Sequence, residues 1–348
     1  MMLKGEVNMQ SLLEIKDMEI SYNTSLGPLR AVDGISFEVA SGESFGLVGE
    51  SGCGKSTSVR GIMGVMDKNA CLLNGEIKYN GVDLTTLSQS DCRDFRWNQI
   101  SFIPQAAMDS FNPVYSLFDQ FREIYKLKGG ISSRKEVRKK AETLYKAVGL
   151  APEMLDSYPH EYSGGMKQRA AIAMALTLDP GVIIADEPVT ALDVIVQKQV
   201  LQQLTKLKKD KNLAIIMITH DISVVAQICD SIAVMYAGKI VEKGSAKEVL
   251  QNTFHPYTLG LKNSFPDISK PDKKLVSIKG TPPSLLDPPS GCRFYPRCPF
   301  REEVCQQQQP ALEEVSTGHV SACFRHEEIM NIRSSSEEVE TWETVEIL

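Results

Sequence analysis

A glycine-rich loop between an apolar strand and a helix is the feature that most constrains this sequence. Residues 49–57 fit the pattern G-x-x-x-x-G-K-[ST] of a phosphate-binding P-loop. The apolar run 45–48 before the loop predicts a buried strand, and residues 56–66 behind it predict a helix. Glycines let successive backbone N–H groups point at one phosphate, and the helix N-terminus adds partial positive charge there. The expected phosphate-binding residues are Gly49, Glu50, Ser51, Gly52, Cys53, Gly54, Lys55, Ser56 and Thr57.

Composition and charge exclude several classes of function. The chain has 348 residues, of which 42% are apolar and 24% charged, as in ordinary soluble proteins. Its net charge of −6, without a long block of Lys or Arg, argues against a protein that binds nucleic acid by neutralising phosphates. No run approaches the roughly 18 apolar residues that span a bilayer, and residues 1–6 lack the apolar core of a signal peptide. We therefore expect a soluble cytoplasmic chain that serves a membrane process only by docking onto a partner.

Hydrophobic periodicity predicts an α/β fold with a helical insertion and a C-terminal appendage. Alternating strands suggest an antiparallel layer, whereas continuous apolar strands separated by helices are typical of a parallel sheet covered on both faces. The predicted strands are 12–22, 35–39, 76–79, 182–185, 213–218 and the hairpin 232–242, and the predicted helices include 117–127, 134–148 and 194–207. Frequent proline past residue 254 indicates a linker and an irregular extension. The Ser- and Glu-rich end of the chain, residues 331–348, predicts a mobile acidic tail.

Two acidic residues follow the apolar strand 182–185, at the sheet edge where α/β proteins bind ligands. Asp186 is expected on the Mg²⁺ side, and Glu187 is expected to orient and deprotonate an attacking water. Lys55 would reach the β- and γ-phosphates of a nucleotide, and the Ser56 hydroxyl would ligate Mg²⁺. The alternative for the acidic pair is an exposed turn that ends a strand.

A second candidate phosphate site lies at Ser163-Gly164-Gly165, which opens the apolar helix 170–178. The three residues present a hydroxyl, unobstructed backbone amides and a helix N-terminus, in a chain with a single P-loop lysine. Taken alone, the same residues would be read as an ordinary helix cap followed by a flexible glycine pair.

The order and spacing of these motifs resemble those of ABC-transporter ATPases over residues from about 11 to 252. Ala191-Leu192-Asp193 and Thr219-His220-Asp221 complete the set. The resemblance implies a P-loop NTPase of the ABC ATPase fold, with a mixed or parallel sheet core, an antiparallel β layer and a helical subdomain at about 106–178. It also implies that each ATP is held between the P-loop of one chain and the Ser-Gly-Gly motif of the facing chain.

Several residue roles follow from this resemblance alone. Gln105 would sense Mg²⁺ and the attacking water, and His220 would contact the γ-phosphate. Tyr22 would stack on adenine, although it could equally be one more half-buried strand residue. Ser163, Gly164 and Gly165 would bind the ATP of the partner subunit, and Asp193 would communicate across the dimer. The implied catalytic residues are Glu187, His220 and Gln105, and the implied Mg²⁺ ligands are Ser56, Gln105 and Asp186.

Met166, which stands where Gln is usual, makes the Ser-Gly-Gly motif resemble that of one ATPase subunit of oligopeptide/dipeptide (nickel) importers. Residues 109–113, 255–258 and the proline-rich extension 253–330 agree with that subfamily. The resemblance implies import of di- or oligopeptides, at the cytoplasmic face of the membrane, with nickel or oligosaccharides as alternative cargo. Implied partners are a second, non-identical ATPase, two membrane permease subunits near residues 105–121, and indirectly an extracytoplasmic binding protein. An ABC-type ATPase acting on nucleic acid or ribosomes is the alternative of a different class.

Four cysteines crowd the C-terminal extension with the spacing C-x5-C-x6-C-x17-C: Cys292, Cys298, Cys305 and Cys323. Disulfides are disfavoured in a reducing compartment, and a segment this small usually needs a metal or a crosslink to fold. Four thiolates suit either tetrahedral Zn²⁺ or a [4Fe-4S] cluster, and the family resemblance favours the cluster. Unligated thiols are a third option, and His319 and His326 are nearby alternatives to Cys323.

Overall fold

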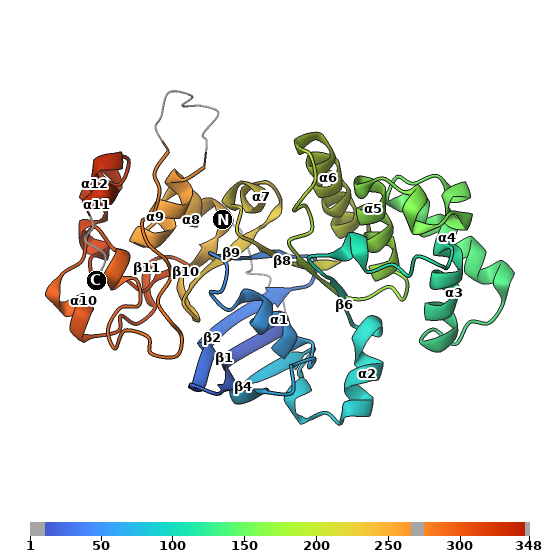
Figure 1. Cartoon of the computed structure of the whole chain (residues 1–348), viewed down its shortest axis with the longest axis horizontal. Coiled ribbons are helices and arrows are strands. Elements are labelled where there is room, and N and C mark those ends of the chain that lie inside the picture. Colours follow the sequence, from blue (N-terminus) through green and yellow to red (C-terminus); the bar gives the residue numbers. More distant parts are fainter. Residues whose placement is uncertain (1–10, 266–274, 345–348) are drawn as a thin grey trace, which may run out of the picture. The chain divides into compact units, whose positions relative to one another are not determined.

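The computed structural model describes residues 11–265 and 275–344 (Figure 1). These residues divide into two compact units, each assembled from separate stretches of the chain. The first, here called the helical unit, contains residues 11–14, 38–44 and 77–217, and the second, here called the P-loop unit, contains residues 15–37, 45–76, 218–265 and 275–344. The C-terminal region thus groups with the P-loop segment, and the domain boundary expected at residue 253 stays a prediction.

Parallel and antiparallel strands together form the larger sheet of the P-loop unit. Its strands are β3 (Ser44–Val48), β9 (Ser231–Tyr236), β10 (Lys239–Ser245), β11 (Glu313–Ser316) and β12 (His319–Ser321). β3 runs parallel to β9, and β9 forms the predicted hairpin with β10. The turn residues Ala237 and Gly238 have φ values of 46° and 84°, as a tight two-residue hairpin requires. β10 also pairs antiparallel with β12, and β12 pairs antiparallel with β11. The C-terminal extension, for which the sequence predicts irregular structure, therefore adds two strands to this sheet.

The strands that the sequence predicts from alternation form a separate four-stranded sheet in the order β2-β1-β4-β5. They are β1 (Ser11–Thr24), β2 (Gly27–Ala40), β4 (Ala70–Tyr79) and β5 (Val82–Asp83). In β2, Ile35, Phe37 and Val39 are buried and the residues between them are less so. The Phe37 ring stacks on Phe45 of β3 with centroids 4.6 Å apart, which joins this sheet to the strand that precedes the P-loop.

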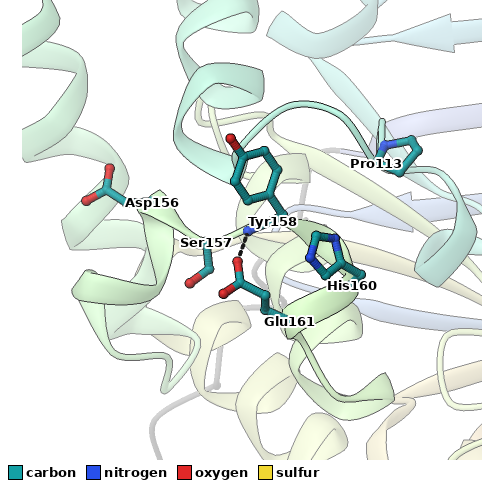
Figure 2. Close-up of a pocket in the computed structure, with 6 residues that line it drawn as sticks. All are labelled: Pro113, Asp156, Ser157, Tyr158, His160 and Glu161. Carbon is teal, nitrogen blue, oxygen red and sulfur yellow. Dashed lines mark hydrogen bonds between the residues drawn. The ribbon is translucent and has the colours of Figure 1, made fainter.

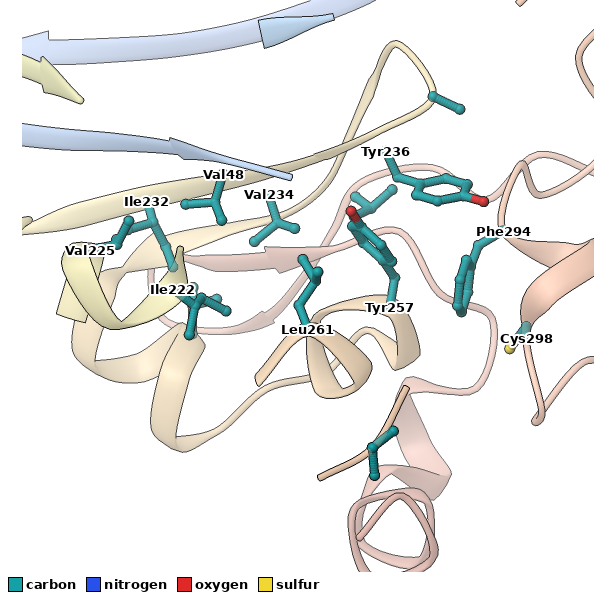
Figure 3. Packing of buried hydrophobic residues seen from close by; sticks show 14 of the residues in the cluster. Val48, Ile222, Val225, Ile232, Val234, Tyr236, Tyr257, Leu261, Phe294 and Cys298 are labelled. Carbon is teal, nitrogen blue, oxygen red and sulfur yellow. The ribbon is translucent and has the colours of Figure 1, made fainter. Parts of the chain in front are cut away.

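Aromatic side chains from distant parts of the sequence form the core of the P-loop unit (Figure 3). Tyr236 at the end of β9 packs against Tyr257 of α9 (Pro256–Asn263), with ring centroids 4.6 Å apart. The ring centroid of Phe294, in the C-terminal region, lies 5.2 Å from that of Tyr236 and 5.4 Å from that of Tyr257. The C-terminal region is therefore built into the core that supports β9. The remaining helices of this unit are α1 (Lys55–Ile62), α7 (Ile222–Ile228), α8 (Ala246–Gln251), α10 (Glu303–Gln307), α11 (Ile329–Ser335) and α12 (Val339–Glu343).

Helices α11 and α12 lie where the sequence predicts a mobile tail. Trp342 of α12 is 1% exposed, and its indole N–H donates to the carbonyl of Ser336 at 3.0 Å. The Asn263 amide of α9 donates to the same carbonyl at 2.8 Å. One buried indole and these hydrogen bonds hold residues 331–344 against the core, and residues 345–348 lie outside the described range.

The helical unit combines short parallel strands with most of the long helices. Its elements are α2 (Gln89–Asn98), β6 (Ile100–Ile103), α3 (Leu117–Leu127), α4 (Arg134–Ala147), α5 (Gly164–Ala175), β7 (Val182–Asp186), α6 (Val194–Lys211) and the start of β8 (Ala214–Thr219). The five α-helices named here each begin at a residue whose side-chain oxygen accepts a backbone N–H of the first turn: Ser88, Ser116, Ser133, Ser163 and Asp193. Among the described helices, none has the length and apolar character needed to cross a bilayer.

Candidate functional site

The P-loop joins β3 to α1 in the strand-turn-helix order that the motif requires. Gly54 precedes α1 with φ of 107°, a backbone conformation that favours glycine. At Gly49, a Cβ atom would lie 2.2 Å from the carbonyl oxygen of Met235 on β9. Glycine is therefore needed at both positions, where no Cβ stands beside the backbone amides that phosphate binding requires.

Lys55 is the first residue of α1 and is largely buried. Its ammonium donates to the backbone carbonyls of Gly49 at 2.7 Å and Glu50 at 2.9 Å, and lies 3.6 Å from the sulfur of Cys53. Burial raises the pKa of the Cys53 thiol despite the nearby lysine charge, so this cysteine is a neutral packing residue. The loop carbonyls thus hold the lysine charge within the motif.

Ser56 is exposed at the second position of α1, where its hydroxyl is accessible to an ion. Tyr22 of β1 is half-buried, and its hydroxyl lies 3.5 Å from the Thr57 hydroxyl. The structure therefore places Tyr22 beside the start of α1. His220 follows β8 and is exposed; it belongs to the same P-loop unit.

In the helical unit, two strands in register bring a glutamine and a glutamate together. β6 and β7 run parallel with Ile103 opposite Ala185, so the residues two positions further along, Gln105 and Glu187, leave the sheet at the same edge. The Gln105 amide donates to Glu187 Oε2 at 2.8 Å, and the Thr190 hydroxyl lies 3.1 Å from the same oxygen. Asp186, the last residue of β7, is buried.

Ser163 is the N-cap of α5, and its hydroxyl accepts the N–H of Met166 at 3.3 Å. Ser163 and Gly164 are exposed, so this helix N-terminus is accessible. A Cβ at Gly165 would lie 2.5 Å from the Val196 side chain of α6. Tyr162, the residue before Ser163, is buried, and its hydroxyl lies within hydrogen-bonding distance of the Tyr145 hydroxyl, at 3.0 Å.

The candidate residues thus form two groups, each within one unit. The P-loop unit carries residues 49–57, Tyr22 and His220, and the helical unit carries Gln105, Asp186, Glu187 and residues 163–165. Asp193, expected to act across a dimer, caps α6 by accepting the N–H groups of Ile195 and Val196. Two residues that bind Glu50 were not predicted from the sequence: Arg297, which bonds its side chain, and Tyr257, which accepts its backbone N–H. Their sequence signals are the position of Arg297 beside Cys298 and that of Tyr257 within the 255–258 motif.

A hollow of about 550 Å³ opens in the helical unit (Figure 2). Its lining residues are Pro113, Asp156, Ser157, Tyr158, His160 and Glu161. The Tyr158 ring is 43% exposed and stacks on His160 with centroids 5.8 Å apart, and the Tyr158 N–H donates to Glu161 at 2.6 Å. A second hollow of about 560 Å³ is lined by residues of the loop before α3 and of α3 itself. Both include residues from the segment 105–121.

The four C-terminal cysteines line one small cavity of about 20 Å³. Burial raises the pKa of Cys292 to about 11 and that of Cys323 to about 12, so without a cation these groups are neutral thiols. His319 pairs instead with the fully buried Glu242, at 2.9 Å. Within the described ranges, no group of three or more His, Cys, Asp or Glu side chains has the placement of a metal site. The metal centre expected from the sequence is therefore not confirmed.

Comparisons with known proteins identify two family segments in the chain. Residues 32–190 match the family described as ABC transporter, and residues 241–305 match the family described as oligopeptide/dipeptide transporter, C-terminal region. The dipeptide transport ATP-binding protein DppD of Caldanaerobacter subterraneus is 40% identical, over 92% of this chain and 98% of the relative. The oligopeptide transport ATP-binding protein OppD of Salmonella typhimurium is 42% identical, over 90% and 93%. The dimeric ATP-binding cassette MJ0796, solved with ADP and phosphate, superposes with a TM-score of 0.60 at 26% identity, over 67% of this chain and 98% of that structure.

Proposed function

Because this chain belongs to the ABC transporter ATP-binding proteins that carry the oligopeptide/dipeptide C-terminal region, we propose that it hydrolyses ATP to drive import of dipeptides or oligopeptides across the cytoplasmic membrane. It is an ABC ATPase by family, and nearly its whole length aligns with peptide-transport ATP-binding proteins at about 40% identity. That alignment, which includes the C-terminal region as well as the ATPase motifs, is the observation that carries the proposal.

ATP binding is assigned to the P-loop and its flanking residues. Backbone amides within the loop 49–57 bind the β-phosphate, and the Lys55 ammonium leaves the carbonyls of Gly49 and Glu50 to bind phosphate oxygens. The accessible Ser56 hydroxyl and the Asp186 carboxylate are oxygen ligands of the kind Mg²⁺ prefers, with Gln105 as a further ligand. Mg²⁺ neutralises phosphate charge when it is bound. Tyr22 beside α1 is available to stack on the adenine.

Water activation is assigned to Glu187, and His220 contacts the γ-phosphate. The contact between Gln105 and Glu187 supports this assignment, because the Gln105 amide and the Thr190 hydroxyl bond Glu187 Oε2 and so orient the carboxylate that would accept a proton from water. The test is Glu187→Gln, which keeps the shape and removes the base. We expect ATP binding to remain and the turnover number to fall about 10²- to 10⁴-fold. Turnover at the wild-type rate would remove Glu187 from this role.

Dimer closure is assigned to Ser163, Gly164 and Gly165 acting on the ATP of a second, non-identical ATPase subunit. Shifting a dimer from about 1:99 to 99:1 closed requires about 5.5 kcal/mol. Hydrogen bonds to charged groups contribute about 1.5–3 kcal/mol each, so a few at each of two sites suffice. Ser163→Ala should abolish ATP-dependent dimerisation and most of the hydrolysis. Ser133→Ala is the control because it removes the same kind of cap from α4. Full hydrolysis by a monomer lacking Ser163 would refute the sandwich.

The membrane permease subunits are assigned to the hollows of the helical unit around residues 105–121, and the chain is assigned with them to the cytoplasmic face of the membrane. The exposed Tyr158 in the lining of the first hollow supports the assignment, because permease segments need an apolar contact. Tyr158→Asp should abolish co-purification with the permeases while ATP binding remains. Leu127→Asp, at an exposed apolar residue that lines neither hollow, is the control. Retained co-purification of Tyr158→Asp would refute the assignment.

The four cysteines are assigned to a [4Fe-4S] cluster, with Zn²⁺ as the alternative. Convergence of Cys292, Cys298, Cys305 and Cys323 on one cavity supports the assignment, since thiolates are the ligands of both. The role is structural: a metal would hold a segment that has few large apolar side chains. Protein purified without oxygen should show visible absorption and four irons per chain, both lost in Cys298→Ser. Colourless protein with stoichiometric zinc would decide for zinc.

A further inference from the structure

The side chain and the backbone N–H of Glu50 in the P-loop are bound by two residues that the ATPase motifs do not include. Its side chain forms two hydrogen bonds with the Arg297 guanidinium, at 2.9 and 3.2 Å. Its backbone N–H donates to the Tyr257 hydroxyl at 2.9 Å, and its carbonyl accepts the Lys55 ammonium. A single P-loop residue therefore links the C-terminal region to the lysine that binds phosphate.

Arg297 is buried and fully engaged. Its side chain is 3% exposed, whereas that of Glu50 is 25% exposed. The other guanidinium contacts are the carbonyls of Lys279 and Ile278, at 2.8 and 3.4 Å, and the Tyr236 hydroxyl at 3.2 Å. Burial by itself would lower the pKa of Arg297, but the hydrogen bonds to Glu50 and Tyr236 outweigh it and raise the pKa. Arg297 thus holds Glu50 from a rigid position.

A second arginine of the same segment reaches the other side of the P-loop. Arg293 donates to the carbonyl of Ala237 in the β9–β10 turn and pairs with Asp33. The next turn residue, Gly238, donates its N–H to the carbonyl of Cys53 at 2.9 Å. The segment 292–298, which has a cysteine at each end, therefore contacts the loop directly at Glu50 and through the turn at Cys53.

We propose that Arg297 is a positioning residue for the nucleotide site: it fixes the P-loop backbone at Glu50 and neutralises a carboxylate that would otherwise repel the phosphates of ATP. The inference rests on the proposed ATPase function. A glycine-rich loop loses much conformational entropy when it binds phosphate. A loop that is already fixed loses less entropy on binding, so it binds phosphate more tightly. A free carboxylate within the loop would also oppose the negative charge of the nucleotide, an effect that salt weakens.

The experiment measures binding of a fluorescent, ribose-labelled ATP with Mg²⁺ to the purified full-length chain. Arg297→Gln should weaken binding about tenfold, the equivalent of one backbone residue left unfixed. The defect should shrink at high salt, and adding Glu50→Gln should recover part of the affinity because the unpaired carboxylate is removed. A role in stability alone would produce neither the salt dependence nor the recovery. Arg333→Gln is the matched control, because that arginine contacts Thr253 and Phe254.

The outcomes separate this inference from the function on which it rests. If the wild-type chain fails to bind the labelled ATP, or if Lys55→Ala binds it equally well, the proposed function fails. If Arg297→Gln is folded and binds ATP as tightly as the wild type and Arg333→Gln, the inference fails and the function stands. If Arg297→Gln does not fold, Tyr257→Phe decides: loss of the acceptor for the Glu50 N–H should weaken ATP binding about threefold, and unchanged binding would overturn the inference.

Discussion

Replacing Asp33 with Asn tests the electrostatics on which the P-loop unit depends. The Asp33 carboxylate forms ion pairs with three cationic side chains. Its Oδ2 pairs with Arg293 and with Lys239, which is 3.1 Å away, and its Oδ1 pairs with Arg30 at 3.3 Å. An asparagine of the same shape must place its NH₂ group against one of these donors, and it removes the negative charge that the three cations share.

The expected cost follows from the exposure of the three partners. The side chains of Arg30 and Lys239 are 54% and 29% exposed, so water can solvate them when the carboxylate is neutralised. Arg293 is 8% exposed and cannot be solvated in the same way. Removing one partner of a buried ion pair typically costs about 3–5 kcal/mol, and we expect about 3 kcal/mol because the amide oxygen still accepts one hydrogen bond.

Urea unfolding followed by tryptophan emission measures this cost. The sequence has two tryptophans, and Trp97 lies in the helical unit, so a Trp97→Phe background leaves the buried Trp342 to report on the P-loop unit. Asp67→Asn is the matched control: its pair with Arg60 has the same chemistry at 2.6 Å, but both side chains are about half exposed. The control should lose less than about 1 kcal/mol. Equal losses in the two variants would show that burial of Arg293 does not govern this site.

Three further changes give distinct results. Gly49→Ala should weaken ATP binding about 10²-fold, because its Cβ would lie 2.2 Å from the Met235 carbonyl oxygen; binding within threefold of the wild type would contradict the close approach. Tyr145→Phe should lower the free energy of unfolding of the helical unit by about 1 kcal/mol, measured through Trp97 emission, because it removes a buried hydroxyl pair. Burial lowers the pKa of His255 to about 3, from 6.5. The unfolded chain therefore takes up this proton below about pH 6.5 and the folded chain does not, so stability is full above that pH and falls by up to about 1.4 kcal/mol per pH unit towards pH 3; His255→Gln should flatten that slope in urea titrations.

The part of the site that the sequence predicts is the part built from local pattern. Strand, glycine loop and helix around residues 45–62 are contiguous, so periodicity and turn chemistry suffice to find them. The Gln105–Glu187 contact joins residues 82 positions apart. The sequence suggests Gln105 only through the family resemblance, because the pairing of β6 with β7 that brings it to Glu187 joins distant segments.

What the sequence could not provide are contacts that depend on packing between distant segments. The polar composition of residues 331–348 predicts a mobile tail, yet one buried indole, Trp342, outweighs it. The contact of Arg297 with Glu50 leaves no periodic signal in the sequence, since the residue pattern around Arg297 does not determine the direction of its side chain. The cysteine spacing likewise does not determine what the four thiols bind, although all four line one cavity.

The 247 positions between Glu50 and Arg297 have a consequence for biosynthesis. Ribosomes extend chains from the N-terminus at about 5–20 residues per second, so the arginine is added about 12 to 50 seconds after the glutamate. During that interval the nascent P-loop has its amides and its lysine but an uncompensated carboxylate. On this reasoning, unfinished chains capture ATP poorly, and competence for the nucleotide arrives only when the late-made segment docks.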